Sequence, residues 1–171
     1  MLPAGFAIWH RSFRGAARGC IACRRTCGPV LDRSVLVVGA GPIGLLVLLA
    51  ARRAGAERVC ITDILDGPLS LAKQLGADAM VNIAAAATKL KDAAQQADGF
   101  EVAFEVSGNP AGLASCLESV RPGGIVVQVG NLPAGRVLVA GNLVMAWPSS
   151  SQCTVRPVSV VVALIRSIIA R

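Results

Sequence analysis

The chain has 171 residues, of which 54% are apolar and 16% charged, a composition typical of a globular protein rather than a disordered one. Its formal net charge of +7 suggests an acidic partner, but the positive charge lies at the two ends. Residues 1–33 contain six Arg and one Asp, and residues 147–171 contain three Arg and no acid. Residues 34–146 contain eight Lys or Arg and nine Asp or Glu. The middle of the chain is therefore nearly neutral, which argues against nucleic-acid binding by the folded domain.

No stretch of the sequence predicts a membrane span. The longest apolar runs, near 45–51 and 158–165, are much shorter than the ~20 residues that cross a bilayer. The N-terminus lacks the pattern of a secretory signal, although its Arg-rich and acid-poor composition resembles that of a mitochondrial transit peptide. We expect a cytoplasmic protein without paired disulfides.

Strands and helices are predicted to alternate from Ser34 onward, because short apolar runs are separated by segments with helical spacing. In chain order we expect strand 34–38, helix 42–54, strand 58–62, helix 68–75, strand 79–82, helix 88–97, strand 101–106, helix 110–120 and strand 123–130. This alternation indicates a parallel sheet covered on both faces by helices, a doubly wound α/β fold.

The pattern weakens after residue 131. Residues 135–146 are compatible with one more strand. Residues 147–157, rich in Ser and Pro, are predicted to be coil, and residues 158–171 fit either a strand or a short helix.

A glycine-rich turn is the main functional motif. The sequence GAGPIG at 39–44 follows a predicted strand and opens a helix, and Asp63 closes the next strand, 19 residues after Gly44. In such motifs the glycines permit a tight turn, close approach of a pyrophosphate and close helix packing, while the acid binds the adenosine ribose. The stretch directly after Asp63, residues 64–72, contains no Arg or Lys to hold a 2′-phosphate, so NAD is favoured over NADP. The alternative is a doubly wound domain that binds no nucleotide.

Ligands of such sheets lie at the carboxyl ends of the strands, which adds the turns after 101–106 and 123–130 to the site. The predicted cofactor-binding residues are Gly39, Gly41, Pro42, Ile43, Gly44, Asp63, Ile64, Ser107, Gly108, Val129 and Gly130. Ser107, Gly108 and Gly130 are expected at the nicotinamide end, unless they belong to ordinary turns.

The predicted domain organisation follows from these observations. An NAD-binding Rossmann domain at 34–146 lies between an irregular N-terminal segment, 1–33, and an irregular C-terminal tail, 147–171. Both tryptophans, the only histidine and four of the six cysteines lie in these two ends.

The sequence resembles the coenzyme domain of the zinc-dependent medium-chain dehydrogenases, and their polyol branch in particular. The resemblance covers about residues 29–146 and rests on VLVVGAGPIGLLVLLAARRAGAERVCITDI, AKQLGADAMVN, FEVSGNPAGL and VRPGGIVVQVGNLP. It implies NAD-linked oxidation of a secondary alcohol on a polyol or sugar acid. It also implies an oligomer, for which we expect contacts through the sheet edge.

The resemblance implies zinc, but the ligands are not recognised in this chain. In the family a preceding catalytic domain supplies a cysteine, a Gly-His-Glu histidine and an acid to the catalytic zinc, and four close cysteines to a structural zinc. His10 has no such surroundings. We therefore assign no catalytic residue and no metal ligand, and expect a truncated protein that is inactive alone. The alternatives are one half of a split dehydrogenase and a non-enzymatic dinucleotide-binding module.

Cys20, Cys23 and Cys27 have zinc-like spacing, but a tetrahedral site needs a fourth ligand, for which His10 is the nearby candidate. We prefer the hypothesis that residues 11–23 and 147–159 are encoded out of frame. Shifted codons compatible with these windows yield a Glu-Pro-Leu-Ala segment and a Gly-Ser-Ser-Arg-Phe turn, which resemble the family at those places. The three cysteines would then be accidents of the reading frame, which the nucleotide sequence tests.

Overall fold

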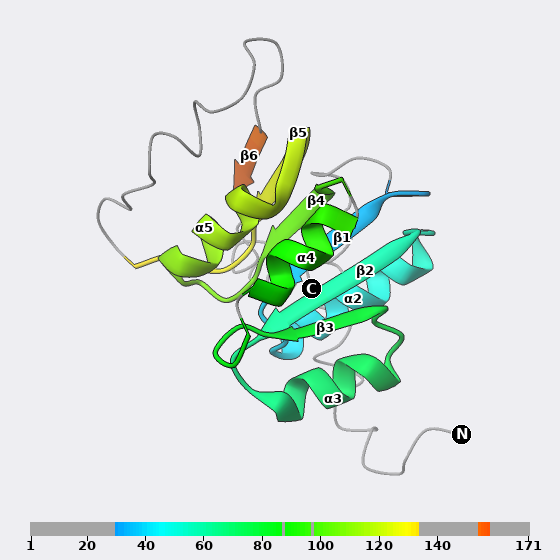
Figure 1. Ribbon diagram of the computed structural model, residues 1–171, viewed down its shortest axis with the longest axis vertical. Coiled ribbons are helices and arrows are strands. Elements are labelled where there is room, and N and C mark those ends of the chain that lie inside the picture. Colours follow the sequence, from blue (N-terminus) through cyan, green and yellow to red (C-terminus); the bar gives the residue numbers. More distant parts are fainter. Residues whose placement is uncertain (1–29, 87, 97, 134–153, 158–171) are drawn as a thin grey trace, which may run out of the picture.

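A computed structural model describes residues 30–86, 88–96, 98–133 and 154–157. Within these residues the strands form one six-stranded sheet in the order β3-β2-β1-β4-β5-β6, and every neighbouring pair is parallel (Figure 1). Helices cover both faces of the sheet, so the predicted doubly wound α/β fold is confirmed.

The observed elements follow the predicted order closely. They are β1 (Ser34–Val38), α2 (Pro42–Arg53), β2 (Arg58–Asp63), α3 (Asp66–Gln74), β3 (Ala79–Asn82), α4 (Thr88–Gln96), β4 (Phe100–Glu105), α5 (Pro110–Ser119), β5 (Val120–Gln128) and β6 (Thr154–Pro157). The agreement arises because each strand is an apolar run and each helix carries apolar residues at helical spacing.

Three predicted boundaries differ by two or three residues, for identifiable reasons. Helix α3 begins at Asp66 rather than at Pro68, because the first turn of a helix tolerates a residue without an N–H. Strand β5 begins at Val120, which pairs with Phe100 before the register shifts around the RPGG turn. It ends at Gln128 because the N–H groups of the next two residues both turn to the Glu105 carbonyl oxygen.

The prediction of coil through residue 157 is also wrong, since Thr154–Pro157 form β6 at the edge of the sheet. Val155 pairs in register with Val126 of β5. The Ser and Pro residues of this stretch indicate coil. A strand forms because Thr and Val are β-branched and because the edge of β5 offers unpaired backbone N–H and C=O groups.

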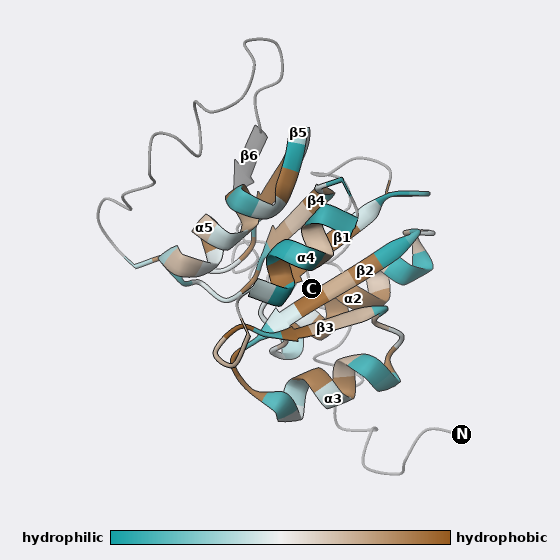
Figure 2. Ribbon diagram, viewed as in Figure 1, coloured by the Kyte–Doolittle hydropathy of each residue, from teal (hydrophilic) through white to brown (hydrophobic). Residues whose placement is uncertain are grey.

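Two apolar clusters hold the sheet between its helices. The first packs Val37 and Ile61 against Leu48 of α2 and Leu69 of α3, and the second lies on the opposite face against α4 and α5. All five residues of β1 are buried. Figure 2 shows the strands as largely hydrophobic, with hydrophilic residues on the helices, as expected of a sheet covered on both sides.

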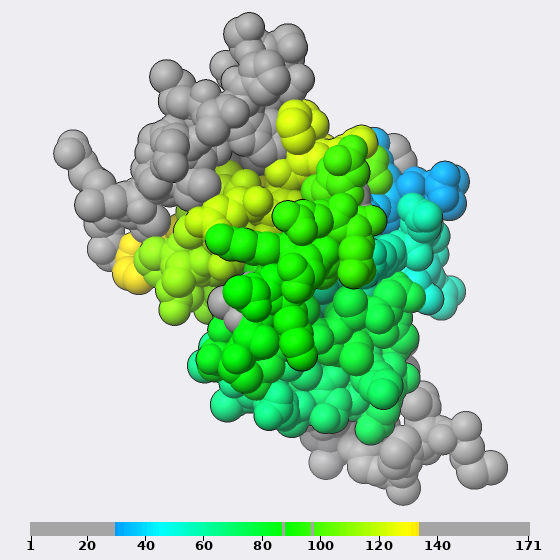
Figure 3. Space-filling view, in the orientation of Figure 1, coloured from blue at the N-terminus to red at the C-terminus, as the bar shows by residue number. Residues whose placement is uncertain are grey.

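The covering is visible in the space-filling view, where α4 and its neighbours lie over the centre of the sheet (Figure 3). In the described ranges no helix has the length and apolar character needed to cross a bilayer. The cysteine cluster with His10, the pattern at 135–146 and residues 158–171 lie outside the described residues.

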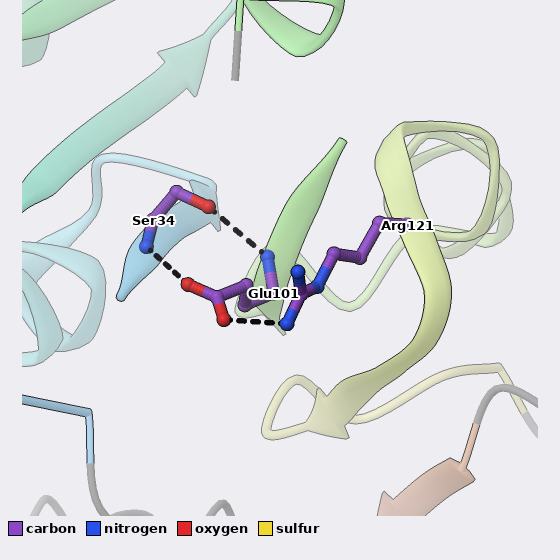
Figure 4. Close-up of polar contacts among 3 residues, drawn as sticks. All are labelled: Ser34, Glu101 and Arg121. Atoms are coloured by element: carbon purple, nitrogen blue, oxygen red, sulfur yellow. Dashed lines mark hydrogen bonds and ion pairs between the residues drawn. The ribbon is translucent and has the colours of Figure 1, made fainter. Parts of the chain in front are cut away.

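One carboxylate joins the amino ends of three neighbouring strands. Glu101 of β4 accepts hydrogen bonds from the Ser34 N–H of β1, at 3.1 Å, and from the Arg121 guanidinium of β5, at 2.6 Å (Figure 4). The Glu101 N–H donates in turn to Ser34 Oγ, at 3.2 Å. This amino-edge network (Ser34, Glu101 and Arg121) lies at the end of the sheet opposite the predicted site.

Candidate functional site

The glycine-rich turn between β1 and α2 is tightly packed at its first and last glycines. Gly39 has φ +105°, a conformation that other residues rarely adopt, and a Cβ there would lie 3.0 Å from the Ser107 nitrogen. A Cβ on Gly44 would lie 1.8 Å from the Gly39 oxygen. The fold itself therefore requires both glycines.

Gly41 differs, because the fold does not require a glycine there. Its φ of −64° and ψ of 179° are open to any residue, and a Cβ would meet no atom of the described chain within 4 Å. Gly41 and Pro42 are both exposed. The missing side chain thus leaves open space in front of the helix.

That open space faces the N-terminus of α2, where the first backbone donors have no partner among the described residues. The first intrahelical bond of this turn runs from the Leu45 N–H to the Gly41 oxygen, at 2.9 Å, and no described side chain caps the helix. The preceding N–H groups of Ile43 and Gly44 have no intrahelical partner, and the helix dipole adds positive potential there. Such a terminus is suited to an anion.

Asp63, at the end of β2, is held against the glycine-rich turn. Its Oδ2 accepts a hydrogen bond from the Ala40 N–H at 2.7 Å, and its Oδ1 accepts one from the Leu65 N–H at 3.0 Å. The neighbouring residues Ile64 and Leu65 are 60% and 59% exposed. An acid and an apolar surface therefore lie together beside the helix terminus.

Two further polar residues border this end of the site, and sequence reasoning missed both. Asn82 of β3 pairs in register with Asp63, and its Nδ2 donates to Asp66 Oδ1 at 2.7 Å. Asn82 Oδ1 accepts from the Ala84 N–H at 3.0 Å. The available signal was an Asn that closes a strand, a residue suited to binding its own turn.

On the other side of the site, the turns after β4 and β5 are held by Glu105, which is 0% exposed. Its Oε1 accepts from Ser107 Oγ at 2.5 Å and from the Gly108 N–H at 3.0 Å. Gln128 Nε2 donates to Glu105 Oε2 at 2.5 Å and to the Gly130 oxygen at 2.8 Å. We call Glu105, Ser107, Gly108 and Gln128 the carboxyl-edge network.

The predicted nicotinamide-end residues occupy unequal positions. Ser107 is exposed, and Gly108 and Gly130 are half-buried. Val129 is only 5% exposed and belongs to the apolar core, so its side chain does not face the site. The turn after β4 reaches the glycine-rich turn, since Ser107 is the residue that a Cβ on Gly39 would strike.

Sequence reasoning missed Glu105 and Gln128, because both lie inside predicted strands. An acid within FEVAFEV and an amide within IVVQV were the available signals, since buried charges are rare unless they are paired. Of the described residues, no group of three His, Cys, Asp or Glu side chains is arranged to hold a metal ion.

The family profile "Zinc-binding dehydrogenase" matches residues 42–161. The chain belongs to the zinc-binding dehydrogenase family. The resemblance stated from the sequence is thereby confirmed at the level of the family.

The chain is also similar in sequence to known dehydrogenases. L-threonine 3-dehydrogenase of Saccharopolyspora erythraea is 42% identical over 120 residues, which make up 68% of this chain and 34% of that protein. The chain thus spans about a third of the length of the curated relatives it matches.

Solved structures of two dehydrogenases share the fold. L-idonate 5-dehydrogenase of Escherichia coli superposes with a TM-score of 0.76 at 27% identity, covering 96% of this chain and 47% of that one. Benzyl alcohol dehydrogenase of Acinetobacter calcoaceticus superposes with a TM-score of 0.74 at 28% identity, covering 85% and 40%.

Proposed function

We propose that the domain binds NAD(H) and is the coenzyme domain of an NAD-dependent alcohol dehydrogenase. The observation that carries this proposal is Gly41. Its neighbours Gly39 and Gly44 are explained by packing within the protein, whereas nothing in the described fold needs a glycine at 41. A ligand whose pyrophosphate lies against the backbone explains the missing side chain.

The roles of the site residues follow from their places. The N–H groups of Ile43 and Gly44 would donate to the pyrophosphate at the helix N-terminus. Asp63 is held toward the turn by the Ala40 N–H, and its remaining lone pairs would accept the ribose hydroxyls. The exposed Ile64 would cover the adenine end. Ser107, Gly108 and Gly130 would lie at the nicotinamide end.

The same residues support a preference for NAD over NADP. Asp63 is a carboxylate where a 2′-phosphate would lie, and Asp66 adds a second carboxylate beside it, held by Asn82. Two acids and no Arg or Lys from 63 to 72 disfavour an additional phosphate through like-charge repulsion.

For the whole enzyme we propose oxidation of a secondary alcohol to a ketone, in which bound NAD⁺ would accept the hydride and the hydroxyl proton would be released to water. The structural likeness to L-idonate 5-dehydrogenase, and the sequence motifs that resemble the polyol branch of the family, favour a polyol or sugar acid. L-threonine is the second substrate to test, because a relative named for it is 42% identical. We assign no step to zinc, since the described residues offer no group of three ligands.

The activity of the chain alone separates the remaining alternatives. We expect NADH binding without alcohol oxidation by the purified 171-residue chain. Turnover of L-idonate or L-threonine with NAD⁺ by this chain would contradict that expectation. Turnover that begins only on addition of a second, zinc-bearing chain would favour a split enzyme over a non-enzymatic dinucleotide-binding module.

The binding proposal is tested by titrating NADH into the full chain and into Gly41→Ala by isothermal titration calorimetry. Because the added methyl meets only the ligand, affinity should fall at least about tenfold, while the free energy of unfolding changes by less than about 1 kcal/mol. A wild-type chain that binds no NADH, or a Gly41→Ala variant that binds as tightly as wild type, would refute the proposal.

A further inference from the structure

Glu105 is a fully buried carboxylate that belongs to neither salt bridge found among the described residues. Removing a carboxylate from water is costly, and an apolar residue of similar size often stabilises a core equally well or better. Fold stability alone is therefore a weak reason for an acid at this position.

The donors to this carboxylate share one location. Ser107 Oγ and the Gly108 N–H belong to the turn after β4, and Gln128 Nε2 lies at the end of β5. Gln128 Nε2 continues to the Gly130 oxygen, so both of its hydrogens are used. The carboxylate thus joins the two turns that flank the nicotinamide end of the proposed site.

The space around the network leaves the two turns little freedom. A Cβ on Gly130 would lie 2.3 Å from the Gly108 nitrogen and 2.7 Å from Glu105 Oε2. A Cβ on Gly112 of α5 would lie 2.5 Å from Ser107 Oγ and 2.9 Å from Glu105 Oε1. The two turns are thus packed directly against each other and against the carboxylate.

We propose that Glu105, acting through Ser107, Gly108 and Gln128, is the positioning residue for the nicotinamide half of the dinucleotide site. This inference rests on the proposed NAD(H) binding. It adds that different residues support the nicotinamide half and the adenosine half of the site. The adenosine half depends on Asp63 and the glycine-rich turn, which meets the carboxyl-edge network at Ser107.

A single neutralising substitution breaks this arrangement without changing its size. In Glu105→Gln an NH₂ group, which is a donor, replaces one of the two carboxylate oxygens. Three donors already point at these oxygens, so one of them faces another donor. If the NH₂ faces Gln128, that amide must turn, and its oxygen then opposes the Gly130 oxygen. If the NH₂ faces Gly108, that N–H loses its 3.0 Å acceptor and keeps only the longer bond, at 3.2 Å, to the remaining oxygen. Either way the hydrogen bonding of one of the two turns is weakened.

The test compares two ligands that differ only at the nicotinamide end. Calorimetry with the full chain measures the affinities of NADH and ADP-ribose, which lacks the nicotinamide. Glu105→Gln should weaken NADH about tenfold and leave ADP-ribose within about twofold of wild type. Gln128→Met leaves Glu105 in place but removes both amide N–H donors of residue 128. It should also weaken NADH more than ADP-ribose, and it carries the test if Glu105→Gln does not fold.

Glu101→Gln is the matched control. Glu101 lies on the same strand and also joins β4 to its neighbours by hydrogen bonds, but at the opposite edge of the sheet (Figure 4). Thermal unfolding should detect a loss of stability in both variants, whereas only Glu105→Gln should change the ratio of the two affinities. A merely structural role of Glu105 would make the two variants behave alike.

The outcomes separate the two proposals. Wild-type chain that binds neither ligand refutes the proposed function and this inference together. Wild-type chain that binds both, with Glu105→Gln weakening both equally or neither, refutes only the positioning role. The positioning role is also refuted if wild-type chain binds NADH no more tightly than ADP-ribose.

Discussion

The two carboxylates of β4 illustrate how one strand serves different purposes at its two ends. Glu101 joins strand to strand, through Ser34 of β1 and Arg121 of β5. Glu105 joins turn to turn, through donors that lie beyond or at the ends of the strands. The comparison teaches that polar networks at the amino edge of a parallel sheet support the fold, whereas those at the carboxyl edge can also shape a binding site.

The largest expected effect is that of Gly44→Ala at the carboxyl edge. The new methyl would lie 1.8 Å from the Gly39 oxygen, so α2 must separate from β1. We expect a loss of at least about 3 kcal/mol in the free energy of unfolding, measured by urea denaturation. Near-wild-type stability would show that the carboxyl edge is more deformable than its packing indicates.

Gly130→Ala should have the next largest effect, because its methyl would push against the Gly108 nitrogen at 2.3 Å. We expect a loss of about 2 kcal/mol in stability, together with a greater loss of affinity for NADH than for ADP-ribose. Calorimetry with both ligands checks this. Equal losses of affinity for NADH and ADP-ribose would indicate that the two turns do not act on the nicotinamide half of the site alone.

The middle of the sheet provides a region unconnected with either edge network. Burial raises the pKa of the Cys60 thiol to about 12 from 9.0, with Arg58 lowering and Asp78 raising it further. Between these two pKa values the thiol ionises in the unfolded chain but stays protonated in the folded one, so stability is lost as pH rises from about 9 toward about 12. The loss should be about 1.4 kcal/mol per pH unit.

Urea denaturation at several pH values checks this loss for Cys60. Cys60→Ala should remove that part of the pH dependence, because no thiol remains at the position. Identical pH slopes in wild type and variant would mean that solvent reaches the centre of β2. NADH affinity near neutral pH should be the same in both proteins, since Cys60 faces the core.

Arg121→Met at the amino edge should have the smallest effect. The Arg121 side chain is 48% exposed, and exposed ion pairs contribute little, so the cost should stay below about 1 kcal/mol. Affinities for NADH and ADP-ribose should both match wild type in calorimetry. A selective loss of NADH affinity would remove the distinction between the two edges.

Much of the fold could be predicted from residue patterns. The bounds of β1 and β3 agree with the predicted ranges, because apolar runs with clear ends are local signals. Strand β6 could not be predicted in this way, since Thr154–Pro157 pair with residues of β5 that lie 29 positions earlier in the chain. Pairing between distant segments depends on which edge is left open, and only the assembled sheet shows that.

For the site, the sequence by itself determined the glycine-rich turn, Asp63 and the order of strands and helices, because spacing and residue type specify these locally. Only the tertiary structure distinguished Gly41 from Gly39 and Gly44, since the difference lies in what surrounds each missing side chain. It also decided that Glu105 and Gln128 meet beneath two turns. Residues 23 positions apart become partners only when neighbouring parallel strands place their carboxyl ends side by side, and that juxtaposition is a property of the folded sheet.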